Sequence, residues 1–173
     1  MKPTALPTAT ATASAAPPSA GAGLLGTALG AWGVLTRALN ALQPLAALLA
    51  RVYVAQVFFM SGLTKLRDWD VTVALFTDEY KVPLLSPSLA AAMGTAGELV
   101  LPVLLVLGVG SRFSPLGLFV VNAVAVISLS EIAPAALQQH IFWGALLAGL
   151  AIYGLGPWSV DKYVAPYLPT AKK

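Results

Sequence analysis

The chain has 173 residues, of which 58% are hydrophobic and only 10% are charged. Soluble domains carry about 25% charged residues, so this composition excludes an ordinary soluble fold and predicts an integral membrane protein in contact with the lipid bilayer. The net charge of +3 comes from scattered cations rather than from a basic stripe with interleaved aromatic residues, which excludes a nucleic-acid-binding surface.

The N-terminal region divides into two predicted parts. Residues 1–22 consist of Ala, Thr, Pro, Ser and Gly with one Lys, a composition that predicts a disordered tail. We expect a bacterial tail rather than a transit peptide, because no Arg precedes Arg37. In residues 23–43, leucines and Trp32 recur every three or four positions, which predicts an amphipathic helix on the membrane surface. The alternative is an early extension of the first membrane span.

Residues 44–165 are predicted to form an all-α membrane domain, an integral membrane four-helix bundle, followed by a short basic tail at 166–173. Each apolar segment is near the roughly 20 residues that a bilayer core requires. The four spans are expected at about 44–65, 87–108, 115–133 and 138–154. Ser86 and Ser114 each precede a proline, so each is expected to cap the helix that follows it.

The segment between the first two spans is predicted to contain a short helix. Asp68 is suited to cap it, and an apolar face then recurs at Trp69, Val73, Phe76 and Tyr80. The alternating residues at its start would also suit a strand. We favour a helix at the membrane surface, because an isolated strand beside a membrane has no sheet to join.

The distribution of cations predicts the orientation in the membrane. An even number of spans places both termini on one side. That side carries Lys2, Arg37, Arg112, Lys162, Lys172 and Lys173, whereas the opposite side carries Lys65, Arg67 and Lys81. Because cytoplasmic segments are enriched in Lys and Arg, we expect a multi-pass protein of the bacterial inner membrane with both termini in the cytoplasm.

Two charged residues fall inside predicted spans. Glu98 lies about 16 Å along its helix from Pro87, near the bilayer centre, where a charge must be paired, neutral or functional. Ala90 and Gly94 offer a small surface that lets another helix approach. Arg51 is the expected partner of Glu98, either as a structural ion pair or as part of a proton or quinone site. The alternative is that Arg51 reaches the lipid headgroups and leaves Glu98 protonated.

A second polar group is predicted at the opposite membrane face. Lys65 ends the first span, Glu131 ends the third and His140 begins the fourth, so antiparallel packing is expected to gather them. Three such groups are too few for a metal site, and we expect none. Gln56 and Asn122 are predicted to hydrogen-bond between helices, and Ala145 and Gly149 to mark close packing of the fourth span.

The cysteine and histidine content limits the cofactors that this chain can bind. The sequence contains no cysteine and one histidine, His140. Disulfides, iron–sulfur clusters and thiolate metal sites are therefore excluded, as is haem held by two histidines of this chain. We expect no metal-bound or covalent cofactor, so redox chemistry would depend on a diffusible group such as a quinone.

Several short motifs resemble the DoxX family of small four-span membrane proteins. They are Arg51, FFMSGLTKL at 58–66, YKVPLLSP at 80–87, GELVLPVLLVLGVGSR at 97–112 and GPWSVDKY at 156–163. The resemblance implies a compact four-helix bundle with cytoplasmic termini. It also implies a membrane partner in redox or sulfur metabolism or in stress responses, similar in some members to the small subunit of a quinone-reducing thiosulfate enzyme. It carries no catalytic residue set onto this chain.

Three functions remain open on the sequence. The first is an accessory or anchoring subunit of a membrane redox or stress-response system, which would bind a soluble oxidoreductase or another membrane subunit. The second is a non-catalytic scaffold or assembly factor whose charges are structural. The third, a small transporter, has less support because broken helices and repeats are not evident. A stand-alone enzyme is not expected, and a homo-oligomer is compatible with all three.

Overall fold

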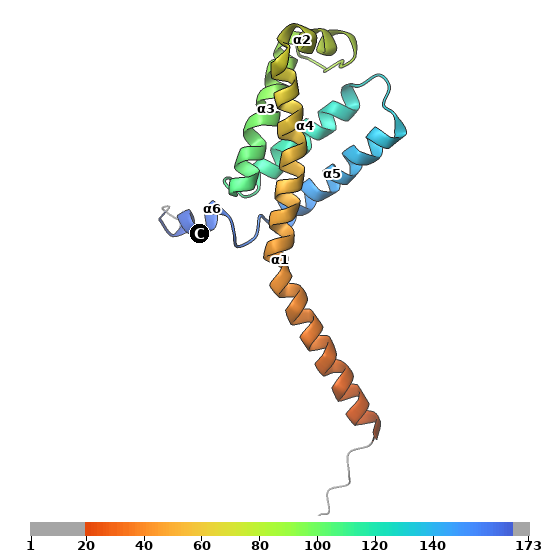
Figure 1. The fold of residues 1–173 in the computed structure, drawn as a ribbon, viewed down its shortest axis with the longest axis vertical. Coiled ribbons are helices and arrows are strands. Elements are labelled where there is room, and N and C mark those ends of the chain that lie inside the picture. Colours follow the sequence, from red (N-terminus) through yellow and green to blue (C-terminus); the bar gives the residue numbers. More distant parts are fainter. Residues whose placement is uncertain (1–19, 168–173) are drawn as a thin grey trace, which may run out of the picture. The chain divides into compact units, whose positions relative to one another are not determined.

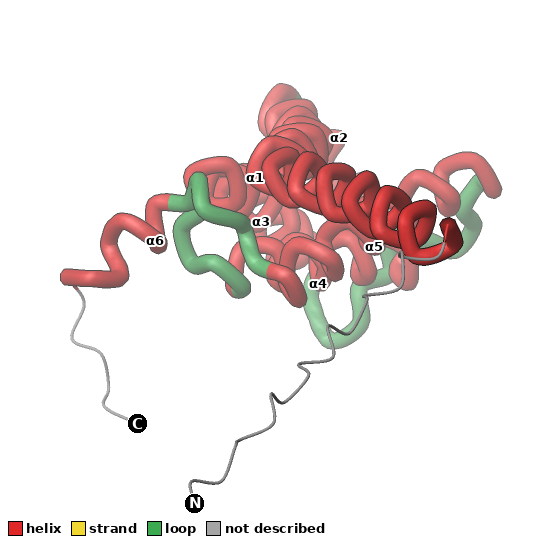
Figure 2. The backbone as a smooth tube through the Cα atoms, turned by 90° about the horizontal axis from the view of Figure 1, so that it is seen from below, coloured by secondary structure: helices red, strands yellow, loops and turns green. Residues whose placement is uncertain are grey.

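The computed structural model describes residues 20–167, and its regular elements in this range are helices (Figure 1). These are α1 (Ala20–Arg67), α2 (Trp69–Asp78), α3 (Pro87–Leu107), α4 (Phe113–Ser128), α5 (Pro134–Tyr153), α6 (Val160–Val164) and the 3-10 helix η1 (Ala165–Tyr167). Loops join the helices (Figure 2). Among the described residues, β-type pairing is limited to one isolated bridge between Tyr80 and Leu129. The all-α prediction is confirmed.

The lengths of the helices fit a membrane protein. By length and apolar composition, α1 from Leu25 to Arg67, α3 and α5 can each cross a bilayer. The fourth predicted span, α4, is apolar but has 16 residues. At about 1.5 Å per residue, α4 is about 24 Å long, somewhat less than the roughly 30 Å hydrocarbon core. The prediction of an integral membrane helical bundle is therefore confirmed, with one span shorter than expected.

The first helix is longer than the sequence suggested. The amphipathic segment and the first span were predicted as separate elements, but α1 runs through both, with Pro44 inside it. The chain divides into two compact units, Met1–Ala41 and Leu42–Lys173. In the first unit the large apolar side chains of α1 from Leu25 to Leu39 are exposed, Trp32 by 66%. The location of this segment on the membrane surface stays a prediction.

The terminal tails lie largely outside the described residues. Disorder was predicted for residues 1–22, of which 1–19 are not described, whereas the last three begin α1. Of the basic tail predicted at 166–173, residues 166 and 167 belong to η1 and the remainder, with Lys172 and Lys173, is not described.

The second unit has a core built from one side of each long helix. Its fully buried side chains include Val54 of α1, Leu105 of α3, Leu118 of α4 and Leu147 of α5. A smaller cluster joins α2 to α3 through Phe76, Ala90 and Ala91. Because lipid tails are as apolar as these side chains, close packing rather than escape from water holds such helices together.

The helix ends agree with the sequence in part. Asp68 caps α2 by accepting a hydrogen bond from the Val71 amide at 3.0 Å, as predicted. The cap predicted at Ser114 is wrong, because α4 starts at Phe113 and Ser114 is buried inside its first turn. α5 starts at Pro134 rather than near 138, since proline fits the first helical position.

Candidate functional site

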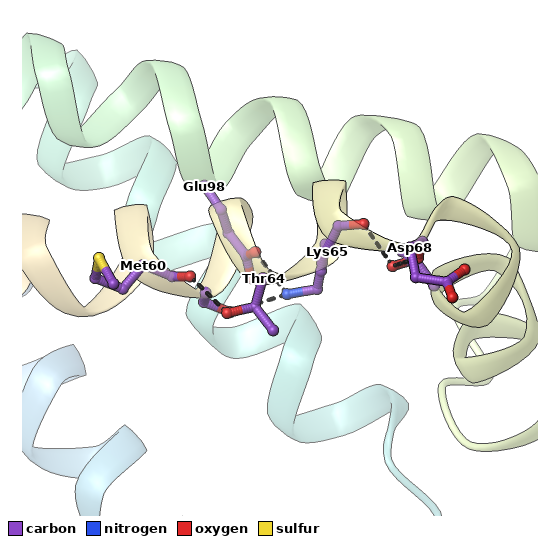
Figure 3. A network of polar contacts seen from close by, with 7 residues as sticks. Met60, Thr64, Lys65, Asp68 and Glu98 are labelled. Carbon is purple, nitrogen blue, oxygen red and sulfur yellow. Dashed lines mark hydrogen bonds and ion pairs between the residues drawn. The ribbon is translucent and has the colours of Figure 1, made fainter.

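A buried ion pair joins α1 to α3 at the end of the bundle that carries α2. The Lys65 ammonium lies 2.5 Å from a carboxylate oxygen of Glu98 and donates a second hydrogen bond to the Ser61 hydroxyl at 2.9 Å (Figure 3). The two charged side chains are only 13% and 10% exposed. Ser61 and Lys65 are four residues apart, so the helix places both on one face.

A glycine allows this pair to form. A Cβ added to Gly62 would lie 2.9 Å from the Leu99 side chain and 3.1 Å from Cβ of Glu98. Real side chains do not pack at the shorter of these distances, so glycine lets the two helices approach at the level of Glu98. The Ser-Gly-x-x-Lys spacing therefore places a hydroxyl against the Lys65 ammonium, and it places that ammonium and a close helix contact against Glu98.

The helix α2 fixes the backbone beside Lys65. The Thr72 hydroxyl is within hydrogen-bond distance of the Lys65 carbonyl at 2.7 Å and of the Asp68 carbonyl at 2.9 Å. Thr72 is buried, and it ties the end of α1 to the first turn of α2. The cation is thus positioned by its own ion pair and by the next helix.

The ion pair forms part of the lining of a pocket of about 410 Å³. The other walls are mostly apolar and come from α2, α3, α4 and the segment after α2. They include Phe76, Tyr80, Val82, Ala90, Met93, Gly94, Val121, Val124 and Ala125. An apolar pocket with a few convergent polar groups is the usual form of a small-molecule site. Here the polar residues are Lys65, Glu98, Tyr80 and Ser128, which bring an ammonium, a carboxylate, a phenol and a hydroxyl.

The phenol of Tyr80 is kept protonated. Burial raises its pKa above the ordinary value, and the carboxylates of Glu98 and Glu79 raise it further. The ring stacks on Phe76 with 5.1 Å between centroids. Tyr80 therefore brings a neutral hydroxyl to the pocket that Lys65 also lines.

The predicted pairing of Arg51 with Glu98 is wrong. Arg51 is 1% exposed and donates to four backbone carbonyls, those of Leu105, Val106, Leu155 and Trp158. These carbonyls lie near the end of α3 and after α5, where helix termini leave acceptors unpaired. A guanidinium with five donors satisfies several of them at once. The predicted alternative, in which Arg51 reaches the headgroups, is equally wrong, since the side chain is buried.

A neighbouring carboxylate closes the same end of the bundle. Asp161 accepts hydrogen bonds from the amides of Gly110 and Ser111 in the turn between α3 and α4. The backbone amide of Asp161 donates to the Gly108 carbonyl at 3.1 Å. Gly108 has a φ of +73°, and a Cβ there would lie 2.5 Å from Ser159, so only glycine fits. Arg51 and Asp161 together bind the segment after α5 to the end of α3.

The predicted cluster of Lys65, Glu131 and His140 does not form. Lys65 points to Glu98, Glu131 is exposed without an ion pair in residues 20–167, and His140 bonds elsewhere. Nδ1 of His140 lies 2.8 Å from Oδ1 of Asn122, whose amide also donates to the His140 carbonyl at 2.9 Å. Asn122 thus joins α4 to α5, as predicted.

Two other packing predictions fail. Gln56 is exposed, and no hydrogen bond from its side chain to another helix is found in the described part of the chain. Around Gly149 a Cβ would meet nothing within 4 Å, and Ala145 is exposed. The close contact of α5 lies instead at Gly144, where a Cβ would be 3.3 Å from Asn122.

Sequence reasoning missed the position of Tyr80 in the pocket and the role of Asp161. Tyr80 was placed only on the apolar face of α2, although its hydroxyl was a signal for a partly polar surrounding. Asp161 had no signal beyond its motif, because its partners are backbone amides. Among the described residues, no group of three or more His, Cys, Asp or Glu side chains could hold a metal ion.

Comparison with known proteins locates the site within a family. Residues 46–131 match the family model of DoxX. No curated protein and no solved structure matches the sequence significantly. The matched range contains Arg51, Lys65 and Glu98, whereas His140 and α5 follow it. The chain is a membrane protein that belongs to the DoxX family.

Proposed function

We propose that the protein is an accessory and anchoring subunit of a membrane-associated redox or stress-response system, and that it holds a quinone head in the pocket beside Lys65 and Glu98. The observation that supports this most is the pocket itself, about 410 Å³ of mostly apolar lining around a buried ion pair. An apolar cavity in a membrane bundle with a few hydrogen-bond donors and one carboxylate suits a flat, weakly polar ring.

The polar groups match the chemistry of a quinone. Quinone carbonyls only accept hydrogen bonds, and the Lys65 ammonium and the Tyr80 hydroxyl both donate. Reduction of a quinone to a quinol takes two electrons and two protons. Glu98 is ionised in its pair with Lys65, so it would take up each of the two protons from water and pass it to the ring, returning to the carboxylate form. The two electrons come from a partner, either a soluble oxidoreductase or another membrane subunit. In this proposal the protein binds, orients and protonates rather than carrying out electron transfer itself.

The orientation belongs to the same proposal. With both termini in the cytoplasm of a bacterial inner membrane, the end of the bundle that carries α2 faces the periplasm. The pocket then lies in the outer half of the bilayer, so a partner that reduces the quinone would dock at the α2 end of the bundle, whereas the Arg51 end faces the cytoplasm. The excess of Lys and Arg on the termini side supports this arrangement.

The competing function is a non-catalytic scaffold or assembly factor. The four carbonyl contacts of Arg51 favour it, because they give an intramembrane charge a purely structural role. A small transporter has less support. The Lys65–Glu98 pocket contains no residue of the Arg51 end, so the two polar clusters do not join into a path.

The test is purification in a mild detergent, followed by solvent extraction and mass spectrometry of any quinone and by identification of co-purifying subunits. We expect a quinone at close to one per chain in the wild type and its loss in Lys65→Met and Glu98→Gln. Lys162→Met is the matched control, since Lys162 is exposed at the opposite end of the bundle. Pure protein with neither quinone nor partner would contradict the proposal and favour the scaffold.

A further inference from the structure

The pocket lies in a wedge between α3 and α4. The two helices touch at Gly97, where a Cβ would lie 3.1 Å from Val121, and at Gly117, where a Cβ would lie 2.9 Å from Leu101. From these contacts α3 and α4 diverge toward the end that carries α2 (Figure 1). Glu98 follows Gly97 directly, so the ion pair sits at the narrow base of the wedge.

The aqueous end of the wedge is covered by the segment between α2 and α3. We define this strap as residues 79–86. The Lys81 amide donates to the Ser128 carbonyl at 2.8 Å, and Tyr80 pairs with Leu129, so the strap is bound to the end of α4. Tyr80, Val82, Pro83 and Leu85 of the strap form one wall of the pocket. The strap therefore lies between the pocket and the water at this end of the bundle, and a smaller cavity of about 220 Å³ lies against it beside Thr77 and Lys81.

The lateral side of the wedge has an apolar, exposed rim. Met93 of α3 is 56% exposed, and Val120 and Ile127 of α4 are 57% and 70% exposed, although all three line the pocket. Behind them the wall of α3 is formed by the small residues Ala90 and Gly94. In an apolar membrane bundle, exposed side chains of this kind face lipid tails. The rim thus borders the bilayer and not the solvent.

From this geometry we infer that the pocket is loaded sideways from the bilayer, through the gap between α3 and α4 beside Met93, Val120 and Ile127. Its ligand is then a membrane-soluble amphiphile, with a polar head at Lys65 and Glu98 and an apolar chain that leaves through the gap into the lipid. That the head is a quinone rests on the proposed function. The lateral opening does not rest on the proposed function, because it follows from the wedge, the strap and the rim alone.

The opening is tested without any ligand by spin labelling. The chain contains no cysteine, so Val124→Cys or Ala125→Cys carries a single nitroxide in the pocket of protein held in lipid nanodiscs. Val100→Cys on the exposed face of α3 and Thr77→Cys on the exposed face of α2 serve as the lipid and water references. We expect the pocket labels to collide with oxygen as Val100→Cys does and to be protected from a water-soluble nickel chelate. Access to the chelate at the level of Thr77→Cys would overturn the inference.

The route is tested by narrowing the rim. Met93→Trp and Ile127→Trp place bulk at the gap, whereas Val100→Trp and Leu116→Trp place it on equally exposed positions outside the pocket. We expect the affinity for decylubiquinone to fall by roughly tenfold or more in the rim variants only. An unchanged affinity in both rim variants would contradict lateral entry. If the wild type binds no quinone at all, the proposed function fails, and the nitroxide measurement still decides on the opening.

Discussion

The Lys65 ammonium and the Glu98 carboxylate lie 2.5 Å apart and join the end of α1 to the middle of α3. Lys65 is long enough to reach down from the end of its helix to a carboxylate deeper in the bundle. The contact leaves neither charge alone in a region where unpaired ions are strongly disfavoured. The same pair contributes to the lining of the largely apolar pocket, so its stability and the proposed ligand chemistry depend on the same two residues.

Removing one charge of the Lys65–Glu98 pair should destabilise the protein more than removing both charges. Lys65→Met or Glu98→Leu alone strands a buried charge, which typically costs about 3–5 kcal/mol. The double variant Lys65→Met with Glu98→Leu removes both charges, and we expect it to recover most of the loss of thermal stability in detergent. Arg51→Leu combined with Glu98→Leu is the control and should show no such recovery. Additive losses in the Lys65 and Glu98 double variant would refute the pairing.

Arg51 should tolerate no replacement, including Lys. Arg51→Lys keeps the charge but cannot donate to four carbonyls in the geometry of the planar guanidinium. We expect a loss of at least about 3 kcal/mol, since several charged hydrogen bonds are lost or distorted. The measurement is thermal unfolding in detergent. Arg112→Lys is the control, because Arg112 is exposed and donates to one carbonyl at 3.3 Å; equal effects of the two changes would contradict the role of Arg51.

The contact at Gly62 should be sensitive to a single methyl group. Gly62→Ala introduces a Cβ that would lie 2.9 Å from the Leu99 side chain and 3.1 Å from Cβ of Glu98, so Leu99 must shift or α1 and α3 must separate. Overpacking of this kind costs about 1–3 kcal/mol, and the Lys65–Glu98 pair should weaken with it. Gly149→Ala, at a glycine with open space around it, should be neutral or slightly stabilising. A neutral Gly62→Ala in the same thermal assay would show that the helices are not in close contact there.

The helix α2 should display two chemically different faces. Asp70 and Asp78 are exposed, whereas Thr72 and Phe76 are buried against the bundle. Single cysteines at 70 and 78 are expected to react readily with an impermeant thiol reagent, and cysteines at 72 and 76 slowly. Because the chain has no natural cysteine, the background is zero. Equal labelling at all four positions would mean that α2 is not packed as described.

The orientation has a simple genetic measurement. A reporter that is active only in the periplasm should be silent when fused after Lys173 and active when inserted near Asp78, in the loop-facing part of α2. The physical reason is the larger number of cations on the side of the termini. The reverse pattern of activity would place the proposed quinone pocket in the cytoplasmic half of the bilayer.

The sequence predicted the helices better than the contacts between polar groups. Apolar periodicity, Ser86–Pro87 and the cap at Asp68 are local signals, and α2 and α3 follow them closely. The partner of Glu98 depends on how far two helices slide past each other, which no local pattern specifies. The depth of Arg51 in the first span favoured it as the partner of Glu98. The spacing of Ser61 and Lys65, one helical turn apart, is the local sign of a polar face on α1. The four acceptors of Arg51 are backbone carbonyls far along the chain, and no residue type in the sequence indicates them.

The contacts of Arg51 constrain the order in which the protein can be made. Trp158, one of its acceptors, lies 107 residues further along the chain, so it is synthesised only after α5. Until then a nascent chain carries an arginine inside its first membrane helix with two of its four carbonyl partners missing. Translation of the segment after α5 thus completes the binding of a charge that α1 carried into the membrane. A ribosome that stops before Leu155 leaves an intermediate marked by an unsatisfied cation, which is a distinct target for membrane quality control.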